Sequence, residues 1–243
     1  MSSLADRIKQ LEESIAAKLS EMGRNPHDCL LLAVTKTHSA KEIFPALQAG
    51  IKAIGENKVQ EASAKVPELR ELCAAEGLSF DFHFIGHLQR NKVRQLLPLQ
   101  PVLIHSVDSV ALAEELSRQN AKLFPGRVQD ILLQVNTSGE SSKGGFGASE
   151  LKQAVDEILK YSNIRICGLM TIGLLAEDTE DARAGFGKLK ELFDMLKRDY
   201  QVLELTWLSM GMTDDYLVAL EEGSNLVRIG SAIFGARDYG RVL

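Results

Sequence analysis

Apolar runs of strand length recur along the chain, and longer amphipathic segments separate them. Eight runs can be read from the sequence: residues 29–34, 51–55, 80–86, 101–107, 130–136, 164–170, 203–209 and 225–230. Near-continuous apolar character is typical of strands that are covered on both faces, as in a parallel sheet. Because strands that alternate with helices form βαβ units, the pattern predicts an α/β fold built on a parallel sheet.

Eight strand–helix units fit a closed (β/α)8 TIM barrel, which takes about 250 residues; the chain has 243. A doubly wound open sheet is the alternative. No linker-like or low-complexity tract divides the sequence, so we expect one domain over residues 1–243. An extra N-terminal helix within residues 1–28 is predicted by five apolar residues at helical spacing: Leu4, Ile8, Leu11, Ile15 and Leu19.

Several polar residues precede the amphipathic segments and predict where helices begin. Ser39, with Glu42 three residues later, fits a capping box. Asp108, Ser149 and Thr213 are each suitable as the N-cap of a later helix.

The charge balance excludes some classes of partner. The net charge is −5 and the pI is about 5.6, whereas binders of nucleic acid or of membrane surfaces usually carry a basic excess. Three cysteines without a CxxC pair, Cys29, Cys73 and Cys167, do not form a disulfide framework and favour a reducing compartment. No apolar stretch approaches the roughly 18 residues of a membrane span, and the N-terminus lacks a secretory apolar segment. We expect a cytoplasmic protein.

Lys36 stands two residues beyond the first apolar run, in the segment LLAVTK. A lysine at a strand end is commonly a solvated surface residue. In a barrel, however, the active site lies at the carboxyl ends of the strands. A chemical role for Lys36 is therefore the second interpretation.

The ends of the seventh and eighth runs indicate an anion site. Barrels commonly bind phosphate groups at these two loops. Ser209 ends the seventh run, Gly230 and Ser231 end the eighth, and both loops lead into predicted helices whose N-terminal ends favour anions. Plain glycine turns are the alternative.

Arg228 interrupts the eighth apolar run, and its side chain alternates in face with those of Val227 and Ile229. If Arg228 faces the barrel interior, its charge needs a partner, because an unpaired buried guanidinium is costly. Either a structural ion pair or a heteroaromatic nitrogen of a ligand would satisfy it.

Two other patterns carry weaker signals. His83 and His87 are four residues apart, which places both on one face of a strand, but no third ligand is obvious and no metal site is expected. Residues 139–147, GESSKGGFG, lack the lysine-Ser/Thr ending of a P-loop and are predicted to form a mobile loop.

A lysine at one strand end and a phosphate cradle across the barrel mouth suggest a ligand with both a carbonyl and a phosphate. Pyridoxal 5′-phosphate (PLP) is the obvious candidate, since its aldehyde forms a Schiff base with lysine. A sugar-phosphate aldolase or isomerase uses the same barrel layout and remains the alternative.

Eight segments in order, between about residue 29 and residue 240, resemble the pyridoxal phosphate homeostasis protein family, also called the proline synthetase co-transcribed homologue family. The segments are LLAVTK, IGENKVQE, HFIGHLQRNK, IHSVDS, LLQVNTSGESSKGG, GLMTIG, LSMGMTDDYLVAL and VRIGSAIFGARDYG. The family often has tyrosine at the position of Lys58 and phenylalanine at that of Ile54.

The resemblance implies a barrel similar to the N-terminal domain of alanine racemase, with PLP bound covalently. Lys36 matches the Schiff-base lysine, and Asn57 matches a position near the cofactor ring. Arg228 matches the arginine that faces the pyridine nitrogen. The phosphate-binding positions of the family are matched by Ser209, Gly230 and Ser231.

The function implied by the resemblance is intracellular PLP, or vitamin B6, homeostasis with little or no turnover. An arginine at the ring nitrogen weakens the electron sink that a PLP enzyme needs, and the chain ends at Leu243 without room for a second β-domain. A PLP-dependent amino-acid enzyme, such as a weak racemase, is the alternative. PLP-requiring apo-enzymes are candidate partners, and a lone barrel with an acidic surface is expected to be a monomer.

Overall fold

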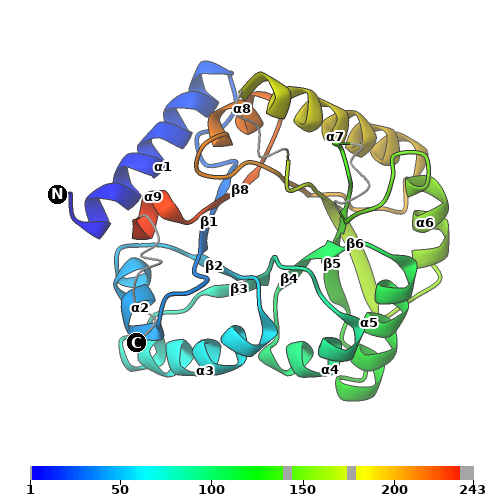
Figure 1. Cartoon of the computed structure of the whole chain (residues 1–243), viewed down its shortest axis with the longest axis horizontal. Helices are drawn as coiled ribbons and strands as arrows, with labels where there is room; N and C mark the ends of the chain where they lie inside the picture. Colours follow the sequence, from blue (N-terminus) through cyan, green and yellow to red (C-terminus); the bar gives the residue numbers. More distant parts are fainter. Residues whose placement is uncertain (1, 139–143, 174–178, 236–243) are drawn as a thin grey trace.

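Eight parallel strands form a closed barrel in the computed structural model, which describes residues 2–138, 144–173 and 179–235 (Figure 1). Each strand pairs with the next along the chain, and the last strand pairs with the first to close the ring. The (β/α)8 barrel predicted from the apolar runs is confirmed, and the open doubly wound sheet is wrong. The strands are β1 Leu30–Val34, β2 Ala53–Glu56, β3 Asp81–Phe84, β4 Leu103–Val107, β5 Gln129–Gln134, β6 Ile164–Met170, β7 Trp207–Ser209 and β8 Leu226–Ile229.

Helices surround the barrel (Figure 1). They are α1 Leu4–Glu21, α2 Ala40–Gln48, α3 Val59–Ala75, α4 Val93–Leu96, α5 Val110–Leu123, α6 Leu151–Ile158, α7 Thr179–Asp199, α8 Tyr216–Glu221 and α9 Ser231–Phe234, with short 3₁₀ turns at Arg90–Lys92 and Leu97–Leu99. Among the described residues, no helix combines the length and the apolar character that crossing a bilayer requires.

The extra N-terminal helix predicted from apolar spacing is α1. It buries Ile8, Leu11, Ile15 and Leu19 and packs against α2, α8 and α9. The side chain of Arg7 ties α1 to α9, since its Nε donates a hydrogen bond to the carbonyl oxygen of Ile233 over 2.8 Å. The helix therefore covers the side of the barrel where β8 closes onto β1 (Figure 1).

The predicted helix starts are correct in one case and displaced in three. Ser39 and Glu42 form the capping box at the start of α2. The other three helices begin one or two residues later than Asp108, Ser149 and Thr213 suggest, with N-caps at Ser109, Glu150 and Asp215. At α5 the reason is visible, because the Ser109 hydroxyl accepts the hydrogen bond from the Leu112 amide, while Asp108 contacts His87.

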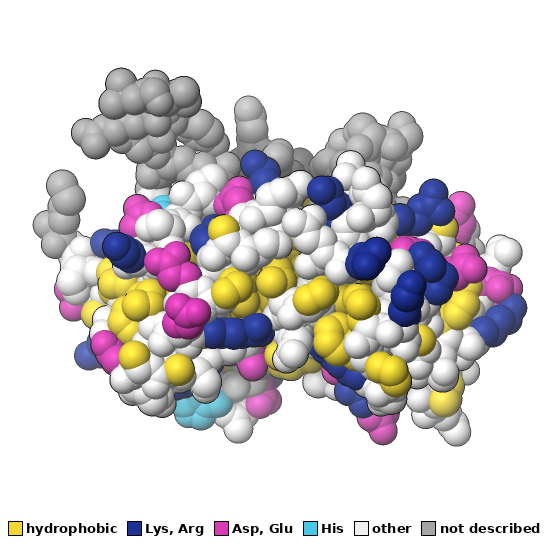
Figure 2. Space-filling model, turned by 90° about the horizontal axis from the view of Figure 1, so that it is seen from below, with side chains coloured by type: hydrophobic (Ala, Val, Ile, Leu, Met, Phe, Trp, Pro, Cys, Tyr) yellow, Lys and Arg dark blue, Asp and Glu magenta, His cyan; other side chains and the backbone are white. Residues whose placement is uncertain are grey.

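Apolar side chains fill two layers. The larger lies between the strands and the helices, and a smaller cluster includes residues of β1, β2, β4, β5, β6 and β8: Leu32, Ala53, Leu103, Leu132, Cys167, Met170 and Leu226. On the outside, the face in Figure 2 carries basic and acidic side chains interspersed with apolar ones. Helices with one face on the core and the other in water produce this mixture.

A one-residue irregularity in β6 brings two strand backbones unusually close. The register with β5 shifts between Ile131 and Leu132, which leaves Cys167 as the extra residue and pairs Leu132 with Gly168. A Cβ atom on Gly168 would lie 1.8 Å from the carbonyl oxygen of Trp207 in β7. Only glycine fits this position.

We predict that Gly168→Ala lowers the free energy of unfolding by about 3 kcal/mol, because the added methyl group forces β6 and β7 apart. Gly77→Ala is the matched control. Gly77 has a φ of 68° and no atom near its would-be Cβ, so only the backbone cost of about 1 kcal/mol is expected there. Urea denaturation measures the free energy of unfolding of both variants. Equal losses in the two variants would contradict the close contact.

Candidate functional site

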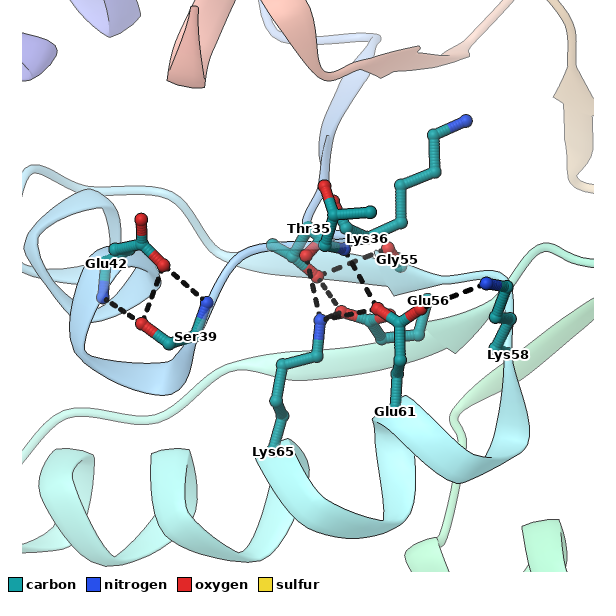
Figure 3. A network of polar contacts seen from close by, with 10 residues as sticks. Thr35, Lys36, Ser39, Glu42, Gly55, Glu56, Lys58, Glu61 and Lys65 are labelled. Carbon is teal, nitrogen blue, oxygen red and sulfur yellow. Dashed lines mark hydrogen bonds and ion pairs between the residues drawn. The ribbon is translucent and has the colours of Figure 1, made fainter. Parts of the chain in front are cut away.

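Lys36 lies just beyond the carboxyl end of β1, in a turn that runs from Thr35 to His38. The turn is closed by a hydrogen bond from the His38 amide to the Thr35 carbonyl oxygen, 3.2 Å long. The Lys36 side chain is partly buried and extends away from the polar residues of β2 and α3 (Figure 3). The sequence prediction that Lys36 stands at the end of the first barrel strand is confirmed.

Arg228 projects from β8, the strand next to β1, at the register position of Leu32. Its side chain is buried, with only 6% of the residue surface exposed. Nη1 donates a hydrogen bond to Ser209 Oγ over 2.7 Å, and Nη2 donates one to the carbonyl oxygen of Thr171 over 2.8 Å. Both partners are neutral.

The charge of Arg228 therefore has no direct counter-ion in the part of the chain that the structure describes. Within the described ranges, no carboxylate forms an ion pair with it, although Asp215 lies near enough to favour its charged form. Burial lowers the pKa of the guanidinium to about 10, which still leaves it charged at neutral pH. A buried cation held by neutral groups is suited to a ligand atom that offers a lone pair.

Two histidines extend this polar chain through the barrel interior. His105 of β4 contacts Ser209 Oγ through Nδ1 at 3.1 Å, and its Nε2 lies 2.9 Å from Nδ1 of His83 in β3. Burial lowers the pKa of His83 to about 4, and burial, together with electrostatic repulsion from His83 and Arg228, lowers the pKa of His105 well below its ordinary value. Both rings are therefore neutral at pH 7, and each can donate one hydrogen bond and accept another.

The predicted placement of His83 and His87 on one strand face is wrong. β3 ends at Phe84, so His87 lies beyond the strand, 70% exposed, with Nδ1 3.0 Å from a carboxylate oxygen of Asp108. His83 points into the barrel instead. No cluster of three or more metal-binding side chains occurs in the described part of the chain.

Asn57, immediately after β2, has an unsatisfied polar atom. Its Oδ1 is buried and has no hydrogen-bond partner among the described residues. The backbone beyond β3 closes over this position, since a Cβ on Gly86 would lie 2.0 Å from the Asn57 carbonyl oxygen. A buried acceptor without a donor is unfavourable in the protein alone.

Gly230 and Ser231 lie where β8 passes into α9. A Cβ on Gly230 would lie 3.4 Å from both Cβ and the carbonyl oxygen of Val34, the last residue of β1. The backbone of the Gly230 loop therefore lies beside the segment that carries Lys36. Ser231 is exposed, and its hydroxyl donates to Thr213 Oγ1 over 3.1 Å.

The structure thus brings Lys36, Asn57, Gly230 and Ser231 to the carboxyl ends of β1, β2 and β8. Ser209 differs, because its hydroxyl is fully buried between Arg228 and His105. Two residues around Arg228 were not predicted from the sequence. Thr171 accepts a hydrogen bond from Arg228, and His105 contacts the Ser209 hydroxyl that Arg228 bonds. Of the glycine-rich segment, residues 139–143 lie outside the described part; Gly144 accepts a hydrogen bond from Gln134.

Lys36, Asn57, Gly230 and Ser231 thus lie at the carboxyl ends of the strands of a closed barrel. This arrangement is typical of (β/α)8 proteins that bind a ligand at that end of the barrel. Comparisons with known proteins give the same class. Residues 12–238 match the family described as alanine racemase, N-terminal domain.

Full-length relatives narrow the identification. A pyridoxal phosphate homeostasis protein of Aquifex aeolicus is 41% identical over 234 residues, which cover 96% of this chain and 98% of the relative. The chain belongs to the family of these pyridoxal phosphate homeostasis proteins.

Solved structures agree with this assignment. An uncharacterised protein of Bifidobacterium adolescentis has a TM-score of 0.88 and 37% identity, and the match covers 95% of this chain and 94% of that one. PipY of Synechococcus elongatus, solved with PLP bound, has a TM-score of 0.78 and 35% identity, over 91% of this chain and 100% of PipY.

We predict that the buried histidines make the fold sensitive to acid. Unfolding lets His83 bind a proton below its ordinary pKa of 6.5, whereas the folded protein resists protonation down to about pH 4. The free energy of unfolding therefore falls as pH drops through this window, by about 2 kcal/mol at pH 5 from His83 alone.

Urea denaturation between pH 7 and pH 5 measures this effect. His83→Gln is expected to reduce the pH dependence to the part that His105 contributes, whereas the exposed His27, changed to Gln, serves as the control and should leave it unchanged. A wild-type slope that persists in His83→Gln would contradict the assignment.

Proposed function

We propose that this protein binds PLP covalently through Lys36 and contributes to intracellular PLP homeostasis, with little or no turnover. The proposal is supported by its membership of the pyridoxal phosphate homeostasis protein family and by the PLP bound to the related PipY. We also propose that the protein is a cytoplasmic monomer and that PLP-requiring apo-enzymes are candidate recipients of its PLP.

The observation that carries the proposal is that Lys36 follows β1 and Arg228 lies on β8, the strand that pairs with β1. Lys36 lies beyond the end of β1, while Arg228 lies on β8 inside the barrel with two neutral partners. An amine and a buried hydrogen-bond donor in this arrangement suit the aldehyde and the ring nitrogen of one aromatic ligand. PLP, when bound, supplies an aldehyde that reacts reversibly with an amine.

The remaining residues of the site fit the same ligand. Asn57 offers a buried oxygen to which no described residue donates a hydrogen bond, and it would lie near the ring. Gly230 and Ser231 would hold the phosphate, with backbone N–H groups and one hydroxyl at the start of α9. Ser209 would contribute through Arg228, to which its hydroxyl is bonded.

The chemistry of Arg228 argues for retention of the cofactor over turnover. A guanidinium donates hydrogen bonds and keeps its protons, so it leaves a ring nitrogen unprotonated. An unprotonated ring is a poor acceptor of the electrons that a carbanion must delocalise. The residues around Arg228 preserve this state, because Ser209 and Thr171 are neutral and His105 resists protonation.

We predict that wild-type protein mixed with PLP shows a near-visible absorbance band and that borohydride fixes the cofactor on Lys36. Lys36→Ala should lose both the band and the modified peptide completely. Lys41→Ala is the control, because Lys41 is an exposed lysine on the neighbouring α2. Absorbance spectra with peptide mass mapping measure the result. A wild-type protein without the band at saturating PLP would contradict the proposal.

A second prediction separates a carrier from a weak racemase. Incubation of the PLP-loaded protein with L-alanine and other L-amino acids should produce no D-enantiomer above the level seen with Lys36→Ala. Chiral chromatography measures the product. Formation of D-amino acid that requires Lys36 would identify an enzyme and overturn the assignment of low turnover.

A further inference from the structure

The backbone beside Lys36 has an unusual conformation. Thr37 has a φ of +72°, and the only other non-glycine residue with positive φ in the described part is Gln100. Turns with positive φ at the third residue favour glycine or asparagine there, and a β-branched residue in this region is strained. Such strain persists only where surrounding contacts enforce it, and it is concentrated at functional sites.

Glu61 of α3 supplies a contact that enforces the conformation. Its Oε2 accepts a hydrogen bond from the Thr37 amide over 2.9 Å. Partial burial opposes ionisation of Glu61, but the Thr37 N–H and Lys65 outweigh this and lower its pKa. The carboxylate is therefore charged at neutral pH and forms a strong hydrogen bond to the strained residue.

Lys65, one turn further along α3, holds the residue on the other side of Lys36. Its Nζ donates to the Thr35 carbonyl oxygen over 2.9 Å, and it pairs with Glu56 at 2.6 Å and with Glu61 at 3.3 Å. The Thr35 hydroxyl also donates to Glu56, over 2.6 Å. Lys65 is buried, with 8% of its surface exposed.

The two neighbours of Lys36 are thus fixed by α3, while the Lys36 side chain points away from these contacts (Figure 3). Stability alone does not require such an arrangement, because well-packed apolar residues can replace a buried ion pair without loss. What the contacts determine is the direction in which Lys36 leaves the backbone.

We propose that Glu61 and Lys65 are positioning residues for Lys36: Glu61 holds Thr37 in its left-handed conformation, Lys65 holds Thr35, and together they aim the amine at the aldehyde of the cofactor. The proposal rests on the proposed function of Lys36. Neither residue needs to touch PLP, and both act through the turn from Thr35 to His38.

The first experiment compares two changes at Glu61. Glu61→Ala removes the acceptor for the Thr37 amide and should slow covalent attachment of PLP on the order of tenfold, since small displacements of a reacting group are costly. Glu61→Gln keeps an acceptor oxygen and should react nearly as fast as wild type. Stopped-flow absorbance with PLP measures the rates, and Glu68→Ala, an exposed acidic position on the same helix, is the control.

The second experiment tests the backbone explanation directly. Thr37→Gly removes the steric cost of positive φ, so the double variant Glu61→Ala/Thr37→Gly should regain most of the lost rate. A role in stability alone predicts no such recovery. Thermal melting confirms that each variant is folded.

The outcomes are distinct. Wild-type rates in Glu61→Ala, equal losses in Glu61→Ala and Glu61→Gln, or no recovery in the double variant would each overturn the positioning role. Hydrogen exchange of the Thr37 amide tests the contact without PLP and should accelerate in Glu61→Ala. If wild-type protein forms no adduct on Lys36 while this exchange behaves as expected, the proposed function fails and the contact itself stands.

Discussion

The burial of one positive charge inside the barrel determines how the site is built. Arg228 cannot be left without polar contacts in that interior, and Ser209 and Thr171 bond it from β7 and from the end of β6. His105 and His83 continue the contacts to β4 and β3. Within the described ranges no carboxylate forms an ion pair with Arg228, so its direct hydrogen-bond partners there are neutral.

Closure of the barrel places the strand that carries Arg228 beside the strand that leads to Lys36. β8 pairs with β1, so the cation on one strand and the amine beyond the other belong to neighbouring segments. Two sets of polar contacts surround these two groups. Inside the barrel, the neutral His105 contacts Ser209, which bonds Arg228. Outside it, the charged residues of α3 bond the turn that carries Lys36. In the proposed function, the histidines would orient the donor at the cofactor ring, and the residues of α3 would orient the amine.

The barrel fold could be predicted from the sequence, because buried parallel strands leave continuous apolar runs. Each observed strand overlaps one of the eight expected. The alternation of Arg228 with Val227 and Ile229 showed that it takes the opposite face of its strand but left open whether that face points inward; the structure places it inside the barrel. The contacts around Arg228 and Lys36 could not be predicted, since the register of distant strands and helices brings Thr171 to Arg228, His105 to Ser209 and Lys65 to Thr35. The helix start at Ser109 was displaced by one residue because Asp108 contacts His87 instead.

In the proposed function, Arg228 donates a hydrogen bond to the ring nitrogen of a cofactor held on Lys36. The most direct measurement is the ¹⁵N NMR spectrum of the protein loaded with PLP labelled at the pyridine nitrogen. We expect the chemical shift of an unprotonated, hydrogen-bonded nitrogen at neutral pH, and a changed shift in Arg228→Gln. A protonated ring nitrogen in the wild-type protein, or a shift that Arg228→Gln leaves unaltered, would contradict it.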